Sequence, residues 1–322
     1  MAIAEKTKWG TAADIDPFTR EIIKHRLYQV SEEATIALEN AAGTLLVTDG
    51  HDMIAALYTP EGEMLYSGAA VLNHPSCAAR AVKGVVKYFE EEGIFEGDVI
   101  MMNDPYSGAL HSPDVFIIQP IFYEGELVSF VASFVHVSDT GSIEPGGFCP
   151  SATESYQEGF QTRGLKLREK GKDRRDVWDT IMNMTRTPDA TIMDYKSQIA
   201  AGYVAQQRME KLVADYGLER VRSVFDDLIA ESEYLFRQRL LEIPDGIYRA
   251  RKYYDLEDEV TRIEVAAIKK GDTLTLDFSN TGPQSAASVN ATLQATEGGI
   301  FPAIYTLLAW DIVWNEGIFK CV

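Results

Sequence analysis

Two apolar runs rich in β-branched and aromatic residues, 115–123 and 126–135, are separated only by Glu124-Gly125. Runs of this kind joined by a short glycine-containing turn are typical of a β-hairpin. Antiparallel pairing about the turn is expected to place Asp114 opposite roughly residue 135. The sequence therefore predicts a hairpin whose open end brings together residues that are far apart along the chain.

A His-x-x-Asp pair flanks each strand of this hairpin at its open end, His111 with Asp114 and His136 with Asp139. Two imidazoles and one or two carboxylates are a suitable ligand set for Zn, Mn or Fe(II). The alternative is that these are ordinary polar residues at strand ends, which is the commoner role of a single histidine. Because four ligand-type side chains converge, metal binding is the favoured interpretation.

Composition limits the function classes. The 322 residues are enough for two domains or one large one. A formal net charge of −19 argues against nucleic-acid and anionic-membrane partners, since such surfaces attract Lys- and Arg-rich faces. Three cysteines without a Cys-x-x-Cys pair indicate a reducing compartment. Residues 1–16 lack the apolar stretch of a signal sequence, and no apolar run approaches the roughly 18 residues of a membrane span. A cytoplasmic protein is expected.

The order of patterns along the chain predicts an α+β fold. Residues 1–14 form an N-terminal arm, and 15–172 form a mixed α/β domain that carries the metal-bearing hairpin. A helical segment follows over 173–242, where Thr187-Pro188 and Gly217 divide the pattern into about three helices. Residues 243–322 are a second β region that is incomplete without further chain.

The last expectation comes from residues 299–319, which are too apolar and aromatic for a frayed tail. They predict a helix and a following turn that enter a core. We therefore expect Cys321-Val322 to be an internal boundary of a larger fold. The alternative is a complete domain with a buried C-terminal helix.

Several segments resemble the hydantoinase B family, which includes the C-terminal part of ATP-dependent 5-oxoprolinase and a large subunit of acetone and acetophenone carboxylases. Residues 103–115, His136-x-x-Asp139-x-Gly141 and Pro145-Gly146 resemble the signature of this family. Further segments are similar in family order: Asp16–Ile22, Gln157–Phe160, Arg186–Asp189, Asp194–Ala200, Tyr216-Gly217 and Leu241–Tyr248.

The resemblance implies a division of labour between subunits. A partner of the hydantoinase A type, with an actin-like ATPase fold, phosphorylates the carbonyl oxygen of a small ketone or cyclic amide. The hydantoinase B-type subunit then acts on the activated carbonyl with a divalent metal, Zn, Mn or Fe, which the resemblance assigns to His111, Asp114 and His136. This chain has no Gly-x-x-x-x-Gly-Lys-Ser/Thr loop, consistent with ATP being used by the partner.

Three residues are candidates for catalytic roles. Asp139 has the type and place of a fourth ligand, or of an acceptor that orients a ligating imidazole. Glu158 is a carboxylate that acts as acid or base if it is buried nearby, and a loop salt bridge is the alternative. His74 falls where the family often has a histidine, facing either the active site or the surface.

Two departures from the family pattern bear on the reaction. Hydantoinase-like members commonly read Gly-Gly-Thr-His and Pro-Gly-Ser-Met, where this chain has Gly108-Ala-Leu-His111 and Pro145-Gly-Gly-Phe148. The second motif, with Tyr156-Gln-Glu-Gly159, is closer to the ketone carboxylases. Carboxylation of a ketone through an enol phosphate, with bicarbonate as a partner, is therefore favoured. ATP-dependent opening of a hydantoin, 5-oxoproline or other lactam is the alternative, and a scaffold subunit with a structural metal is the third.

Overall fold

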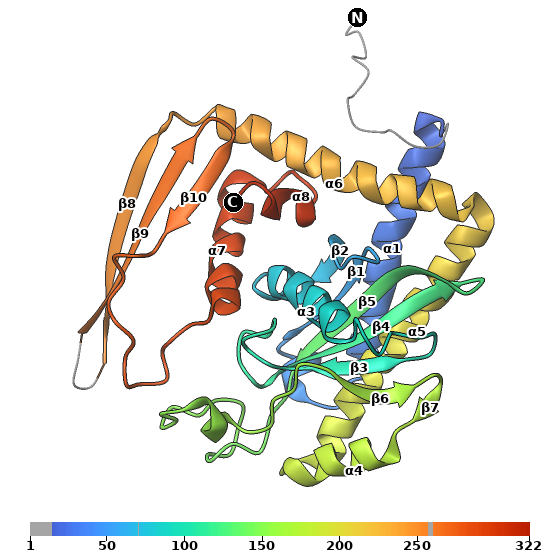
Figure 1. Ribbon diagram of the computed structural model, residues 1–322, viewed down its shortest axis with the longest axis horizontal. Helices are drawn as coiled ribbons and strands as arrows, with labels where there is room; N and C mark the ends of the chain where they lie inside the picture. The colour runs from blue at the N-terminus through green and yellow to red at the C-terminus, as the bar shows by residue number, and fades with distance from the viewer. Residues whose placement is uncertain (1–14, 70, 257–259) are drawn as a thin grey trace, which may run out of the picture.

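The structure is a computed structural model that describes residues 15–69, 71–256 and 260–322, so the predicted N-terminal arm lies outside the described residues. A seven-stranded antiparallel sheet with the order β2-β1-β5-β4-β3-β6-β7 forms its centre (Figure 1). Its strands are β1 (Met53–Tyr58), β2 (Met64–Ala69), β3 (Val99–Met102), β4 (Asp114–Tyr123), β5 (Glu126–His136), β6 (Leu165–Glu169) and β7 (Lys172–Asp173).

Strands β4 and β5 form the hairpin that the apolar runs predict. Glu124 and Gly125 both have positive φ, 50° and 83°, as a tight two-residue hairpin turn requires. Leu127 pairs with Phe122, but the next pair is Ser129 with Ile121, so Val128 is an extra residue in β5. Such a bulge shifts the register of everything beyond it. Asp114 therefore pairs with His136 and not with residue 135.

Alternation of side chains along the strands gives the sheet two apolar faces. One face packs against α1 (Pro17–Ala41), α5 (Pro188–Tyr216) and α6 (Leu218–Leu241). The other face packs against α3 (His74–Tyr88), which lies in front of the sheet in Figure 1. Between the bulge and the open end of the hairpin, residues with even numbers, such as Phe116 and Phe134, belong to the α3 face. Asp114 and His136 therefore share that side of the sheet.

Helix ends follow the sequence signals. The carboxylate of Asp16 accepts a hydrogen bond from the backbone N–H of Thr19 at 3.0 Å, and Pro17 occupies the first turn of α1. The helical segment divides as predicted into α4 (Arg175–Met184), α5 and α6. Pro188 begins α5, and Gly217, with φ 86°, separates α5 from α6. The short helices α2 (Leu45–Thr48) and η1 (Ser155–Glu158) lie in connections.

The C-terminal part contains a second sheet and two helices. Strands β8 (Gly246–Asp255), β9 (Val260–Lys270) and β10 (Thr273–Asp277) pair in the order β10-β9-β8. Helix α7 (Leu293–Leu308) and helix α8 (Glu316–Phe319) follow, and α7 lies between α3 and this sheet (Figure 1). Phe301 and Ile304 are buried, whereas Leu307 and Trp310 are exposed. The expected apolar helix and following turn are therefore present, with part of their apolar surface uncovered.

The architecture is mixed α and β with antiparallel sheets, in agreement with the α+β prediction. Among the helices of the described ranges, none combines the length and apolar character needed to cross a membrane.

Candidate metal centre

Three neighbouring strands of the large sheet bring polar residues together at one edge, where the ends of these strands meet. Asp114 begins β4 and pairs with His136, the last residue of β5. Strand β1 lies on the other side of β5, and Asp52 immediately precedes it. The backbone N–H of His136 donates to the carbonyl of Asp52 at 3.2 Å, which extends the pairing by one residue. Asp52, His136 and Asp114 thus lie side by side across three strands.

Two further histidines reach this edge from outside the sheet. His74 is the first residue of α3, and its ring stacks on Phe134 with 3.7 Å between ring centroids. His111 lies three residues before β4, and its ring centroid is 4.9 Å from that of His136. The face of the sheet that α3 covers therefore ends in three imidazoles and two carboxylates.

Asp114 is at the centre of this group, which we call the His/Asp cluster: Asp52, His74, His111, Asp114 and His136. Oδ1 of Asp114 is 3.3 Å from Nδ1 of His136 and 3.4 Å from Nε2 of His111. Its Oδ2 is 3.9 Å from Nδ1 of His74. Nε2 of His74 is in turn 3.4 Å from Oδ1 of Asp52.

Electrostatics favour metal-binding forms of Asp114 and His111 but shift His136 toward its protonated form. Burial alone would raise the pKa of Asp114, but the hydrogen bond from His136 and the nearby histidines lower it overall. Burial lowers the pKa of His111, so this imidazole is neutral at neutral pH. For His136, burial lowers the pKa, but interaction with Asp114 outweighs it and the pKa rises. Asp114 is therefore ionised, and a cation competes with a proton at His136.

The cluster fits a divalent metal because its polar atoms are not satisfied within the protein. The side chain of Asp114 is fully buried, and in the described part of the chain its Oδ2 has no hydrogen-bond partner. Oδ1 of Asp52 and Nδ1 of His74 are also buried without a hydrogen-bond partner among the described residues, although each faces a group of opposite type at 3.4 Å and 3.9 Å. Buried polar atoms normally have partners, and three such atoms in one place need an explanation. Potential ligand atoms of His111, Asp114 and His136 lie within 4.8 Å of one another, and nitrogen and oxygen donors suit Zn, Mn and Fe(II).

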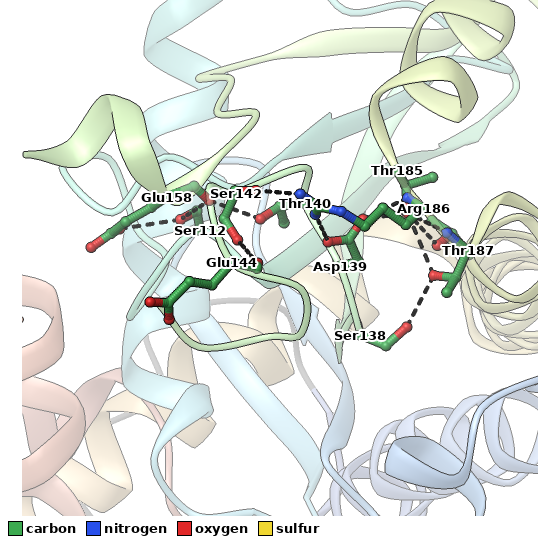
Figure 2. Close-up of polar contacts among 11 residues, drawn as sticks. Ser112, Ser138, Asp139, Thr140, Ser142, Glu144, Glu158, Thr185, Arg186 and Thr187 are labelled. Atoms are coloured by element: carbon green, nitrogen blue, oxygen red, sulfur yellow. Dashed lines mark hydrogen bonds and ion pairs between the residues drawn. The ribbon is translucent and has the colours of Figure 1, made fainter. Parts of the chain in front are cut away.

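Asp139 lies in a different network, drawn in Figure 2. Its Oδ1 accepts a hydrogen bond from Nη1 of Arg186 at 2.6 Å, and its Oδ2 accepts from the backbone N–H of Arg186, also at 2.6 Å. The hydroxyl of Thr185 donates to Oδ2 as well, at 3.3 Å. Both oxygens of Asp139 are therefore engaged by the α4–α5 connection, and no ion pair joins Asp139 to a cluster histidine among the described residues.

Glu158 lies at the end of η1, on the other side of the network in Figure 2. The hydroxyl of Ser112, the neighbour of His111, donates to Oε2 of Glu158 at 3.2 Å. The hydroxyl of Thr140 donates to the backbone carbonyl of Glu158 at 2.8 Å. Glu158 is thus tied to the loop that carries His111 and makes no salt bridge within the described ranges.

A cavity of about 320 Å³ opens beside the cluster, and we call it the His111 cavity. Three loops line it: 105–113 before β4, 140–158 after β5, and 284–292 before α7. The third loop is far away in the sequence, but the Ser288 hydroxyl donates to the carbonyl of Pro150 at 3.1 Å. His111 and Glu158 both line the cavity, so the cluster has access to a space of the size that small-molecule sites occupy.

Sequence reasoning overlooked two residues of this region, Asp52 and Arg186. Asp52 stands directly before the apolar run 53–58 that forms β1, and that position was the available signal. Its nearness to His136 depends on β1 pairing with β5, a long-range choice that periodicity does not reveal. Arg186 lies in a segment that resembles the family pattern, but its partner Asp139 is 47 residues away.

Comparisons with known proteins give one consistent result. The profile of the family described as hydantoinase B/oxoprolinase matches residues 16–322. The acetophenone carboxylase delta subunit of Aromatoleum aromaticum is 28% identical over 323 residues, which cover 99% of this chain and 47% of that protein. This chain spans about half the length of curated relatives that it matches.

Two solved structures have the same fold. The crystal structure of ATP-dependent caprolactamase from Pseudomonas jessenii matches with a TM-score of 0.88 at 28% identity, covering 96% of this chain and 54% of the other. Nucleotide-free acetone carboxylase matches with a TM-score of 0.89 at 22% identity, covering 95% of this chain and 43% of the other.

Proposed function

Because the chain belongs to the hydantoinase B/oxoprolinase family, we propose that it is the metal-containing catalytic subunit of a heteromeric ATP-dependent enzyme. In this proposal a partner subunit of the hydantoinase A type uses ATP to phosphorylate a carbonyl oxygen. The present chain then acts on the activated carbonyl compound at the His/Asp cluster. The observation that carries the proposal is the buried Asp114 carboxylate, which lies among three imidazoles with one oxygen unpartnered in the described part of the chain.

His111, Asp114 and His136 are the residues that would hold the metal. Asp52 and His74 lie beside them, with Nδ1 of His74 3.9 Å from Oδ2 of Asp114 and Oδ2 of Asp52 3.9 Å from Nδ1 of His136. A bound dication supplies a positive charge that stabilises negative charge developing on oxygen, or it activates water. The protein residues have separate tasks. Asp114 fixes the orientation of the imidazoles around it, and Phe134 holds the ring of His74 by stacking. Glu158, at the wall of the His111 cavity, is placed to accept or donate a proton.

Carboxylation of a ketone is the favoured reaction, with bicarbonate as the source of carbon. The acetophenone carboxylase relative and the Pro145-Gly-Gly-Phe148 motif support this choice. Opening of a cyclic amide is the second candidate, and the likeness to caprolactamase at 28% identity supports it. Both reactions begin with phosphorylation of the carbonyl oxygen. In the carboxylation the activated ketone then attacks the carbon that bicarbonate supplies, whereas in the ring opening water attacks the activated amide.

The first test is the metal content of the purified chain. We expect close to one first-row divalent metal per chain, and His111→Ala or His136→Ala should remove most of it while the fold remains. His25→Ala is the matched control, because His25 is exposed on α1. Absence of metal in the native chain, with none taken up on soaking, would reject the metal centre.

The second test uses the complex reconstituted with its ATPase partner, which a pull-down from the source cell should recover. Bicarbonate-dependent ATP use with carboxylated product identifies a carboxylase, and bicarbonate-independent ring opening identifies a hydrolase. If His111→Ala leaves ATP use and product formation intact, the cluster has a structural role only.

A further inference from the structure

The charged residues of the His111 cavity are of one sign. Glu154 and Glu158 line it, and no lysine or arginine is found among the described residues of its wall. The nearby arginines are already engaged elsewhere, Arg186 with Asp139 and Arg163 with Asp104, at 2.6 Å and 3.1 Å. Away from the His/Asp cluster, a carboxylate on a bound molecule would therefore meet Glu154 and Glu158 and find no lysine or arginine in the described wall.

The same cavity exposes aromatic surface. Tyr106 and Phe148 line it from two different loops and are 68% and 67% exposed. When a bound molecule covers such exposed aromatic side chains, their apolar surface is removed from water. This removal favours binding. The backbone of Tyr106 is held by its neighbours, since the Gln294 side chain donates to its carbonyl at 3.2 Å and its N–H donates to Asp104 at 3.0 Å. The loop that carries the Tyr106 ring is thus anchored beside the cavity.

We propose that the His111 cavity binds uncharged carbonyl compounds with an apolar or aromatic body and discriminates against carbonyl compounds that carry a carboxylate. This rests on the proposed function, in which the reacting carbonyl faces the His/Asp cluster. With the carbonyl at His111, the rest of the molecule extends along a wall made of aromatic surface and two glutamates. Simple ketones and unsubstituted lactams suit this wall, whereas 5-oxoproline does not.

The position of the negative charges strengthens the distinction. Glu158 is held by Ser112, one residue from His111, so its carboxylate stays near the reacting end of the cavity. A substrate carboxylate two or three bonds from the carbonyl, as in 5-oxoproline, would come close to it. The discrimination is therefore expected to act on compact substrates as well as on long ones.

Matched probe pairs test the proposal by binding alone. The first pair is 2-pyrrolidinone and 5-oxoproline, which share a lactam ring and differ by one carboxylate. The second is acetophenone and 4-acetylbenzoate, which differ in the same way. Dissociation constants are measured on the full chain by ligand-observed NMR, without ATP or a partner. We expect the uncharged member of at least one pair to bind at least about tenfold more tightly than its carboxylate counterpart.

Two variants connect any discrimination to the cavity. Ala286→Lys adds a cation to an exposed position of the wall and should bring the two members of a pair within about threefold of each other. Glu158→Gln should weaken the discrimination without removing binding of the neutral probe. Glu91→Gln, which removes the same charge from an exposed residue outside the cavity, should leave the ratio unchanged.

Equal or tighter binding of the carboxylate member in the unmodified chain overturns the proposal, as does absence of binding by every probe. Discrimination that survives Ala286→Lys also overturns it, because the selectivity would then arise elsewhere. These outcomes are separate from failure of the proposed function, which is read from metal content and from turnover by the complex.

Discussion

Asp139 and Arg186 form an ion pair that fixes the start of the loop lining the His111 cavity. The Asp139 side chain is 3% exposed and that of Arg186 is 45% exposed, so the pair joins the interior to the surface. Nη2 of Arg186 also donates to the carbonyl of Ser142 at 2.7 Å, and the Ser142 hydroxyl donates to the carbonyl of Glu144 (Figure 2). One arginine from the α4–α5 connection thus holds the backbone after β5 at two points.

Arg186→Ala should loosen this loop. The substitution leaves the buried Asp139 carboxylate with only its hydrogen bonds from Thr185 and the backbone. It also removes the hydrogen bond that Arg186 donates to the carbonyl of Ser142. We expect a loss of about 1–2 kcal/mol in the free energy of unfolding, measured by urea denaturation. The loss is not larger because Arg186 is partly exposed and water screens its interaction with Asp139. Amide hydrogen exchange over residues 138–150 should become faster. Arg175→Ala, which removes an exposed arginine of α4, is the control and should change neither quantity.

Substitution of Asp52 and substitution of Asp139 are expected to affect metal affinity to different extents. Asp52→Asn should weaken metal affinity by about 10–100-fold, the range found when a residue that supports a metal ligand is removed. Asp139→Asn should change affinity much less, because both of its oxygens face Arg186 and Thr185. Titration of the metal-depleted variants with Zn²⁺ or Mn²⁺ measures both. Loss of metal from Asp139→Asn equal to that from His111→Ala would identify Asp139 as a ligand.

Gly147 packs against the ring of His136. A Cβ at position 147 would overlap Nε2 of His136 and come within 3.2 Å of the carbonyl of Val137. Gly147→Ala is therefore expected to displace the imidazole and reduce metal affinity, although it adds only one methyl group. Gly299→Ala is the control, since a Cβ there meets no atom within 4 Å among the described residues. Unchanged metal affinity in Gly147→Ala would mean that the loop moves away freely.

Cys77 should be unreactive in the folded chain. Burial raises the pKa of its thiol to about 12, and the thiol donates to the carbonyls of Asn73 and Gln294. The thiolate is the reactive form, so at pH 8 only about one molecule in 10⁴ is ready to react. The thiolate fraction should rise about tenfold per pH unit until the pKa is reached. Peptide mapping after iodoacetamide treatment measures this, with the chain in guanidinium as the positive control. Fast native labelling at pH 8 would show that α3 opens at Cys77.

The local elements were predictable because their signals are local. Asp16-Pro17, Pro188 and Gly217 mark helix ends through capping and ring geometry, and the structure has helix boundaries at these places. The hairpin was predictable from its two runs and turn. The pairing of Asp114 with His136 was not, because the bulge at Val128 depends on how β5 fits between its neighbours. Asp52 was missed for a related reason, since its place depends on the β1–β5 pairing.

The bulge at Val128 also has a consequence for how the chain reaches this state. A regular hairpin closed from the same turn would place Val135 opposite Asp114 and turn the far half of β5 over, because a one-residue slip exchanges the two faces of a strand. That alternative can form from the same turn at Glu124-Gly125. It differs from the observed hairpin only in that Val128 is paired and does not form a bulge. We expect it to be rejected late, when β1 docks on β5 and α3 covers the correct face. Assembly of the sheet, and not closure of the turn, then decides whether a newly made chain is competent to bind metal.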